Sequence, residues 1–167
     1  GSEESIVAGV ETLKAELRER GGLHLYGLVN NAGVSRRLPV ELEPMAELRR
    51  AFDVNFFGAY HLTQLLLPVM RGTAGGHHQG ARVVNIGSVA GLVANPLSST
   101  YSATKFAMEA FTMSLRREIG AFGMSASIVN PAYVKTEIAA KQLGDASHFS
   151  GLAEADRALY DHVIAGQ

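Results

Sequence analysis

The stretch from Ser88 to Lys105 reads SVAGLVANPLSSTYSATK and links an apolar strand pattern to a helical one. Tyr101 and Lys105 are four residues apart, so in a helix their side chains lie on the same face. An ammonium group beside a phenol favours the phenolate, which would let Tyr101 exchange protons near neutral pH. Ser88 follows the apolar run 82–86, at the expected carboxyl end of a strand. The stretch therefore predicts a compact acid/base site.

Helical and strand patterns alternate along the rest of the chain. Ser2 is a good N-cap residue, and Gly21-Gly22 ends the helical pattern that follows it. The predicted strands cover residues 23–30, 82–86 and 124–130. Further helices are predicted over 44–70, 101–121, 138–143 and 154–164. This order favours an α/β fold with a parallel, doubly wound sheet and helices on both faces, in three α/β/α layers.

Two local features refine this picture. Within the helix expected over 44–70, the segment VNFFG (54–58) contains an amide and a glycine, so we expect a local disturbance of the hydrogen-bond ladder. Residues 30–33, Ser88 and 131–136 all follow predicted strands. Because ligands bind at the carboxyl ends of strands in open α/β sheets, we expect the site at that edge.

Composition narrows the possible functions. Hydrophobic residues make up 47% and charged residues 19% of the 167 residues, which is typical of one packed domain over 1–167. The net charge of −1 argues against nucleic-acid binding. The absence of cysteine excludes disulfides and thiolate zinc sites. No apolar run reaches the ~18 residues of a membrane span, and no signal-peptide pattern opens the chain, so we expect a cytoplasmic protein.

Five short motifs occur in order along the chain. They are Asn30-Asn31-Ala32-Gly33, the lone Asn55, Ser88, Tyr101-x-x-x-Lys105 and Asn130-Pro131-Ala132-Tyr133-Val134-Lys135-Thr136. Together they resemble the short-chain dehydrogenase/reductase family over residues 5–137. The resemblance implies a Rossmann-type fold and a reversible, NAD- or NADP-dependent oxidation of an alcohol or reduction of a carbonyl compound.

The resemblance also implies catalytic roles. Tyr101 would give a proton to the carbonyl oxygen during reduction, or remove it from the alcohol during oxidation. Ser88 would hold the substrate oxygen, and Lys105 would assist Tyr101 while bonding the nicotinamide ribose. Asn55 would hold a water molecule that links Lys105 to solvent. Acid/base help of this kind is worth roughly 10²–10⁴-fold in rate.

Cofactor contacts are implied at two further motifs. Asn30, Ala32 and Gly33 would line the adenosine side, and the same motif would tie neighbouring strands together. In the last motif, Pro131 and Val134 would lie near the nicotinamide and Thr136 near the pyrophosphate. That motif departs from the family at position 132, where alanine replaces the usual glycine.

Nothing before Asn30 supplies the Gly-rich turn with which the family holds the pyrophosphate. In the family's terms the chain begins at the helix before the fourth strand. We therefore expect a piece of a longer enzyme, in which strand 23–30 has an unpaired edge. For this chain alone we expect weak dinucleotide binding.

Other kinds of site fit the sequence less well. Ser88 as a hydrolase nucleophile is disfavoured, because Gly87-Ser88 lacks the residue that G-x-S-x-G places between them, and the later histidines, His148 and His162, lie in an irregular tail. His77-His78 and Arg36-Arg37 are expected to be solvated loop residues rather than metal or phosphate ligands.

A non-catalytic interaction or dimerisation module is the second hypothesis. Its partner surface would be helices 44–70 and 101–121, which the resemblance implicates in homodimers or homotetramers. For the enzyme, residues 137–165 would cover the substrate. The segment SLRRE (114–118) resembles the family branch that acts on lipophilic alcohols such as steroids and retinoids.

Overall fold

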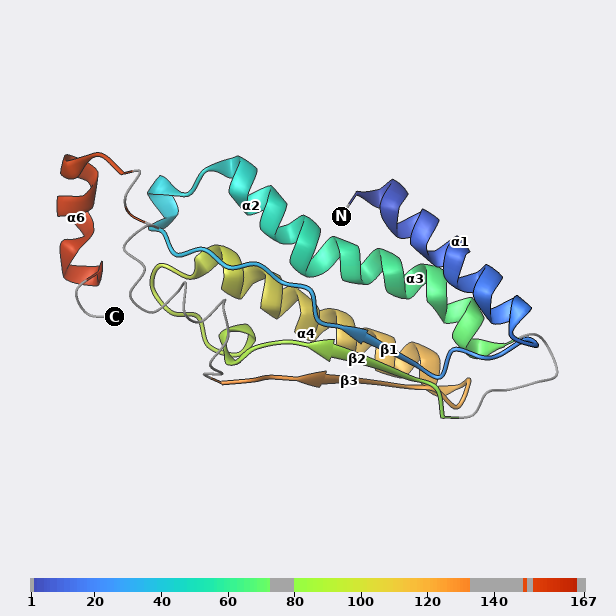
Figure 1. The fold of residues 1–167 in the computed structure, drawn as a ribbon. Helices are drawn as coiled ribbons and strands as arrows, with labels where there is room; N and C mark the ends of the chain where they lie inside the picture. The colour runs from blue at the N-terminus through green and yellow to red at the C-terminus, as the bar shows by residue number, and fades with distance from the viewer. Residues whose placement is uncertain (1, 73–79, 133–148, 150–151, 165–167) are drawn as a thin grey trace.

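A sheet of three parallel strands carries the fold, with helices along one of its faces (Figure 1). The computed structural model describes residues 2–72, 80–132, 149 and 152–164. The strands are β1 (Gly27–Asn30), β2 (Arg82–Ile86) and β3 (Ser125–Val129), in the order β1-β2-β3. The helices are α1 (Glu3–Glu19), α2 (Met45–Phe52), α3 (Gly58–Arg71), α4 (Ser99–Gly120) and α6 (Glu154–Ile164). The predicted α/β class and parallel sheet are confirmed.

Local sequence signals set most of the element ends. The Ser2 hydroxyl oxygen caps α1 by accepting from the Ser5 amide at 3.2 Å, and Gly21 and Gly22 follow the helix with φ angles of +84° and +73°. Strand β2 coincides with the predicted 82–86. Strand β1 is shorter than the predicted 23–30, because its ladder with β2 begins at the pair Gly27 and Arg82.

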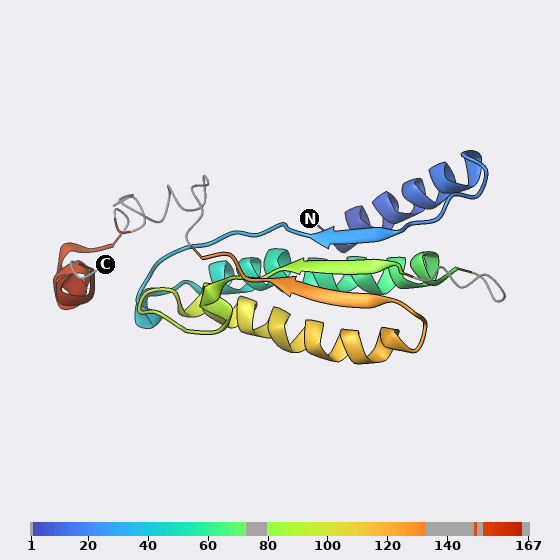
Figure 2. The same ribbon diagram turned by 90° about the horizontal axis from the view of Figure 1, so that it is seen from below.

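The core lies between the sheet and the helices. The side chains of Leu28, Val83 and Ala126 point to this face from the three strands, and they pack with Met70 and Leu115 from α3 and α4. The opposite face is open in the described part of the chain (Figure 2), where Val29 is 61% exposed. The described helices thus supply one of the two helix layers that we expected. Among the described strands β1 pairs only with β2, so its other edge has no neighbouring strand in this part of the chain.

The helix predicted over 44–70 is interrupted where its sequence indicated. Helices α2 and α3 are joined by a π-helical turn at Asp53–Phe57, so the predicted disturbance is confirmed. A π-turn inserts an extra residue into the helical ladder and is frequent at functional sites. It leaves Asn55 2% exposed, facing α4 rather than solvent.

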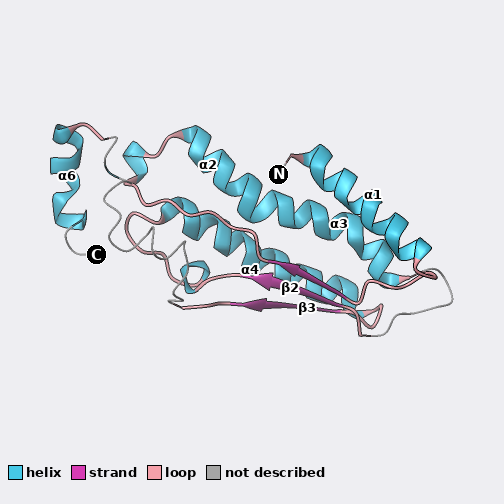
Figure 3. Cartoon of the chain, viewed as in Figure 1, coloured by secondary structure: helices cyan, strands magenta, loops and turns pink. Residues whose placement is uncertain are grey.

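Helix α6 confirms the helical pattern at 154–164, whereas the helix expected over 138–143 lies outside the described residues. Figure 3 shows α6 beyond the end of α2. There the Tyr160 hydroxyl donates to the Glu41 carboxylate, in the short turn Val40–Leu42 between β1 and α2. None of the described helices combines the length and apolar character that crossing a bilayer requires.

Candidate active site

The three strands end at one edge of the sheet, because they are parallel and in register. Asn30 pairs with Asn85, and Ile86 pairs with Val129. The segment containing Ser88 therefore leaves the sheet beside the end of β3. The turn before α4 then leads to Tyr101, so the predicted residues approach one region from different elements.

Lys105 is the buried cation of this region. Its side chain is only 4% exposed, and its ammonium nitrogen donates to the carbonyl oxygen of Ile86 at 2.7 Å. The same nitrogen lies 5.6 Å from the ring centroid of Tyr101, as the four-residue spacing predicted. Burial lowers the pKa of Lys105 from its ordinary value. An ammonium group has three N–H donors. One of those of Lys105 is used by the bond to Ile86, and the other two have no acceptor among the described residues.

Asn55 joins the loop after β1 to helix α4. Its amide oxygen accepts from the Val34 amide at 2.7 Å, and its amide nitrogen donates to the Val34 carbonyl at 2.9 Å. The same nitrogen donates to the Thr104 hydroxyl at 3.0 Å. A β-carbon on Gly33 would lie 3.7 Å from the Asn55 amide oxygen and 4.0 Å from the Lys105 nitrogen. Asn55, Gly33 and Lys105 therefore meet at one point.

Ser88 caps a 3₁₀ turn, Val89–Gly91, through a bond from the Ala90 amide to its hydroxyl oxygen at 3.1 Å. No described residue accepts the hydroxyl proton of Ser88. The backbone of Gly91 packs closely against α4. A β-carbon at position 91 would lie 2.9 Å from the Lys105 carbonyl oxygen. This close approach holds the Ser88 turn on the helix that carries Tyr101 and Lys105.

Asn30 takes part in a buried polar network. Its side-chain nitrogen donates to the side-chain oxygen of Asn85 at 2.8 Å and to the Thr63 hydroxyl oxygen at 2.9 Å. Asn85 in turn donates to the Thr112 hydroxyl at 2.8 Å. The strand-tying contact expected of the first motif is thus observed, between β1 and β2. Sequence reasoning missed Asn85 and Thr112, because an asparagine within an apolar strand gives no sign of its partner.

Only some of the remaining predicted cofactor residues lie in the described part of the chain. Ala32 is exposed, and Gly33 and Pro131 are half-buried near the same edge. Val134 and Thr136 lie outside the described residues, as do His77, His78 and His148.

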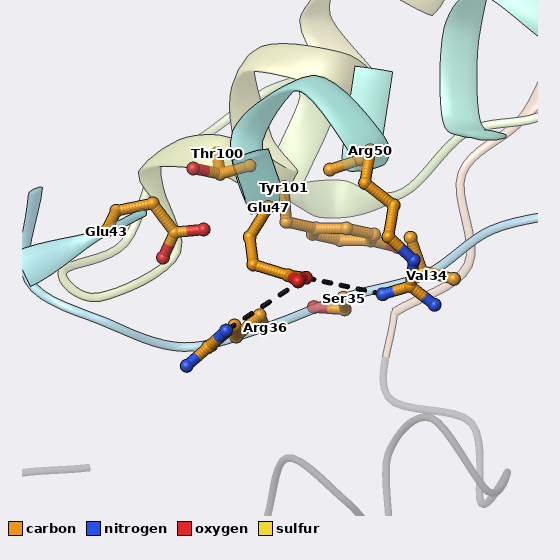
Figure 4. Close-up of a pocket in the computed structure, with 9 residues that line it drawn as sticks. Val34, Ser35, Arg36, Glu43, Glu47, Arg50, Thr100 and Tyr101 are labelled. Carbon is orange, nitrogen blue, oxygen red and sulfur yellow. Dashed lines mark hydrogen bonds and ion pairs between the residues drawn. The ribbon is translucent and has the colours of Figure 1, made fainter. Parts of the chain in front are cut away.

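A pocket beside Tyr101 was not foreseen from the sequence (Figure 4). Tyr101 is half-buried, and no described residue hydrogen-bonds to its hydroxyl group. The Glu47 carboxylate lies 3.3 Å from the Arg50 guanidinium and 4.0 Å from that of Arg36. A Glu43 carboxylate oxygen is buried in the wall and has no hydrogen-bond partner among the described residues, and burial raises the pKa of Glu43. Arg36, expected to be a solvated loop residue, therefore lines a site of mixed charge.

Comparison with known proteins decides the family. A family model described as short chain dehydrogenase matches residues 1–146. The chain belongs to the short-chain dehydrogenase family. The chain is 38% identical to human retinol dehydrogenase 16 over 140 residues, which cover 83% of the chain and 41% of that protein. It is 39% identical to mouse mitochondrial D-beta-hydroxybutyrate dehydrogenase over 130 residues, covering 77% and 35% respectively.

A solved relative supports the fold directly. The structure of gluconate 5-dehydrogenase from Burkholderia cenocepacia, in complex with NADP and tartrate, matches at 29% identity with a TM-score of 0.70. The match covers 84% of the present chain and 53% of the chain of that relative. The Rossmann-type assignment is thereby confirmed, with an incomplete sheet of three strands. The chain spans about half or less of the length of these relatives.

Proposed function

We propose that this chain carries the catalytic residues of an NAD- or NADP-dependent enzyme that interconverts alcohols and carbonyl compounds. One observation carries the proposal. The buried ammonium of Lys105 lies against Tyr101, whose hydroxyl has no hydrogen-bond partner among the described residues, on the helix against which the Ser88 turn packs. A phenol and a serine hydroxyl free to donate, beside a fixed cation, suit proton transfer to one substrate oxygen.

Each residue has a distinct role in the proposed reaction. During reduction Tyr101 donates its proton to the carbonyl oxygen, and the Ser88 hydroxyl donates a hydrogen bond to that same oxygen. Oxidation reverses both roles. Lys105 stabilises the phenolate that remains on Tyr101. A nicotinamide nucleotide held beside these residues would supply or accept the hydride. Asn55 holds the loop after β1 against α4, and its predicted role in holding water stays part of the proposal.

The donors around Lys105 suit a nicotinamide nucleotide. Two of its three ammonium donors lack acceptors among the described residues, and the ribose hydroxyls would accept from them. Gly33 lies beside the same nitrogen and leaves room there that a side chain would fill. We assign Asn30, Ala32, Gly33, Pro131, Val134 and Thr136 to the surroundings of the cofactor.

The pocket favours a substrate with a polar group near the reacting carbon. Arg36 and Arg50 offer donors, and Glu43 and Glu47 offer acceptors, around the Tyr101 ring. The lipophilic alternative, a steroid or retinoid, rested on residues 114–118. Arg116 of that segment is bound to the Ala126 carbonyl of β3 at 2.7 Å, and none of the segment lines the pocket. Because the chain is similar to retinol dehydrogenase 16, retinoids are included among the substrates to be tested. Residues 137–165 are proposed to cover the substrate.

We also propose that the protein forms a homodimer or homotetramer. Large apolar side chains remain exposed on the π-turn, α3 and α4, where Phe57, Tyr60, Phe106 and Met113 are each 45–54% exposed. Such a surface is typical of an interface. A non-catalytic dimerisation module would use the same surface, so turnover separates the two functions.

Absorbance of the reduced cofactor at 340 nm tests the proposal. The complete enzyme, in which we expect this chain to be one part, is given NAD or NADP with alcohols of three kinds: hydroxy acids, polyols and retinoids. We expect turnover with at least one polar alcohol, and loss of that turnover in the Tyr101→Phe variant. The Tyr26→Phe variant is the control, because it removes an exposed phenol outside both the site and the proposed interface. Equal turnover by wild type and Tyr101→Phe would overturn the assignment.

A further inference from the structure

A chain of hydrogen bonds runs from helix α4 to the backbone of Ser88. The carboxylate of Glu109 accepts from the side-chain nitrogen of Asn130. The side-chain oxygen of Asn130 accepts from the backbone amide of Ser88 at 2.9 Å. Asn130 lies just after β3, so the side chain connects three elements: α4, the end of β3 and the turn after β2.

The chemistry of the two partners allows only one orientation of the Asn130 amide. A carboxylate can only accept, and a backbone N–H can only donate. The amide nitrogen must therefore face Glu109 and the oxygen must face Ser88, as observed. Removing either partner would leave the amide held by one hydrogen bond instead of two.

Gly87 makes this bridge possible. A β-carbon at position 87 would lie 2.0 Å from the side-chain oxygen of Asn130, so any other residue would displace the amide from Ser88. The backbone on both sides is paired: the Gly87 amide donates to Val129 at 2.8 Å, and the Val89 amide donates to Pro131 at 3.1 Å. The Asn130 side chain fills the remaining position between these two bonds.

Glu109 also shares a helix face with the proposed acid/base pair. Tyr101, Lys105 and Glu109 follow one another at intervals of four in α4, so they lie along one side of the helix. The helix that presents the proton donor therefore also anchors the serine that holds the same substrate oxygen.

We propose that Asn130 and Glu109 are positioning residues for Ser88. They set the placement of the Ser88 backbone relative to Tyr101, and so the direction of the Ser88 hydroxyl. The inference rests on the proposed function in one respect, which is that Ser88 bonds the substrate oxygen. Misplacement of a reacting group by about 1 Å costs on the order of 10²-fold in rate.

An exchange of the two polar groups tests the inference. Asn130→Asp sets two carboxylates against each other and removes the donor to Glu109. Adding Glu109→Gln restores a pair, with the glutamine amide now donating to the aspartate, which still accepts from Ser88. Asn130→Leu removes both bonds at similar volume. Glu118→Gln and Asn95→Asp are the matched controls, because both side chains are exposed away from the bridge.

Two readouts are needed. Hydrogen exchange of the Ser88 amide, followed by NMR on the 167-residue chain, reports the bridge without any turnover. We expect exchange at least tenfold faster in Asn130→Asp and Asn130→Leu, and near the wild-type rate in the double variant and both controls. In turnover assays of the complete enzyme, kcat should fall about 10- to 100-fold in the same two variants and recover in the double variant, with KM for the dinucleotide unchanged.

Either of two results would overturn the inference. One is unchanged Ser88 exchange in both Asn130 variants. The other is faster exchange accompanied by wild-type kcat. Failure of the proposed function looks different: the wild-type protein would show a protected Ser88 amide and turn over no alcohol or carbonyl compound.

Discussion

The ammonium nitrogen of Lys105 lies 5.6 Å from the centroid of the Tyr101 ring and is held there by the carbonyl oxygen of Ile86 at 2.7 Å. The carbonyl group of Ile86, in β2, thus holds the Lys105 ammonium group close to Tyr101, in α4. Because the nitrogen is buried and bound on one side only, it faces both the phenol and the space beside Gly33.

This dual position predicts different defects for the two side chains. Tyr101→Phe should lower kcat by roughly 10²–10⁴-fold and leave dinucleotide affinity nearly intact, because it removes only the proton donor. Lys105→Ala should lower both kcat and dinucleotide affinity, since Lys105 assists Tyr101 and makes the proposed ribose contact. Calorimetric titration of the dinucleotide alongside turnover separates the effects. Unchanged affinity in Lys105→Ala would rule out the ribose contact.

Ser88 should depend on its hydroxyl rather than its size. Ser88→Ala is expected to lower kcat/KM by about 10- to 100-fold, while Ser88→Thr keeps a hydroxyl and should retain most of the activity. Ser114→Ala, an exposed position on α4, serves as the control. A covalent adduct between Ser88 and a fluorophosphonate probe would instead revive the hydrolase hypothesis.

Asn55 should matter for stability as well as for activity. Asn55→Ala leaves the Val34 amide and carbonyl and the Thr104 hydroxyl without their side-chain partner. We expect the free energy of unfolding, measured in urea, to fall by about 1–3 kcal/mol. Asn95→Ala, in an exposed loop, should change it by less than about 0.5 kcal/mol. Similar values for the two variants would show that the Asn55 bridge contributes little.

The lowered pKa of Lys105 predicts a pH-dependent stability. Between its lowered pKa in the folded state and the ordinary value of 10.5, the unfolded chain binds the proton and the folded chain does not. The contribution of Lys105 to stability is therefore fully present above 10.5 and is lost as the pH falls through the folded-state pKa.

Urea unfolding across this pH range checks the sign. The comparison is between Tyr101→Phe and the double variant Tyr101→Phe/Lys105→Met. Both variants lack the Tyr101 phenol, so they differ only in the side chain at position 105. We expect the free energy of unfolding of Tyr101→Phe to rise relative to the double variant as the pH increases, by at most about 1.4 kcal/mol per pH unit. A difference that stays constant with pH would contradict the lowered pKa.

Much of the fold followed from local patterns. The cap at Ser2, the strand over 82–86 and the disturbed helix around Asn55 depend on residues close together in the chain, and the structure has all three. The prediction for β1 was too long, because the apolar run 23–30 does not show where its neighbour begins to pair. Ala32 and Pro131 lie at the expected sheet edge, but their contact with a cofactor stays a prediction.

The sequence by itself determined the order of elements, the family motifs and the spacing of Tyr101 and Lys105, because caps, periodicity and helical spacing are local properties. Only the tertiary structure decided what the buried polar side chains bind. Asn130 reaches Ser88 across 42 positions of sequence, and Asn55 reaches Thr104 across 49. The pocket that unites Arg36 and Glu43 with Tyr101 was likewise hidden. Such contacts form only when the parallel strands bring distant segments to one edge, where most buried donors and acceptors find a partner.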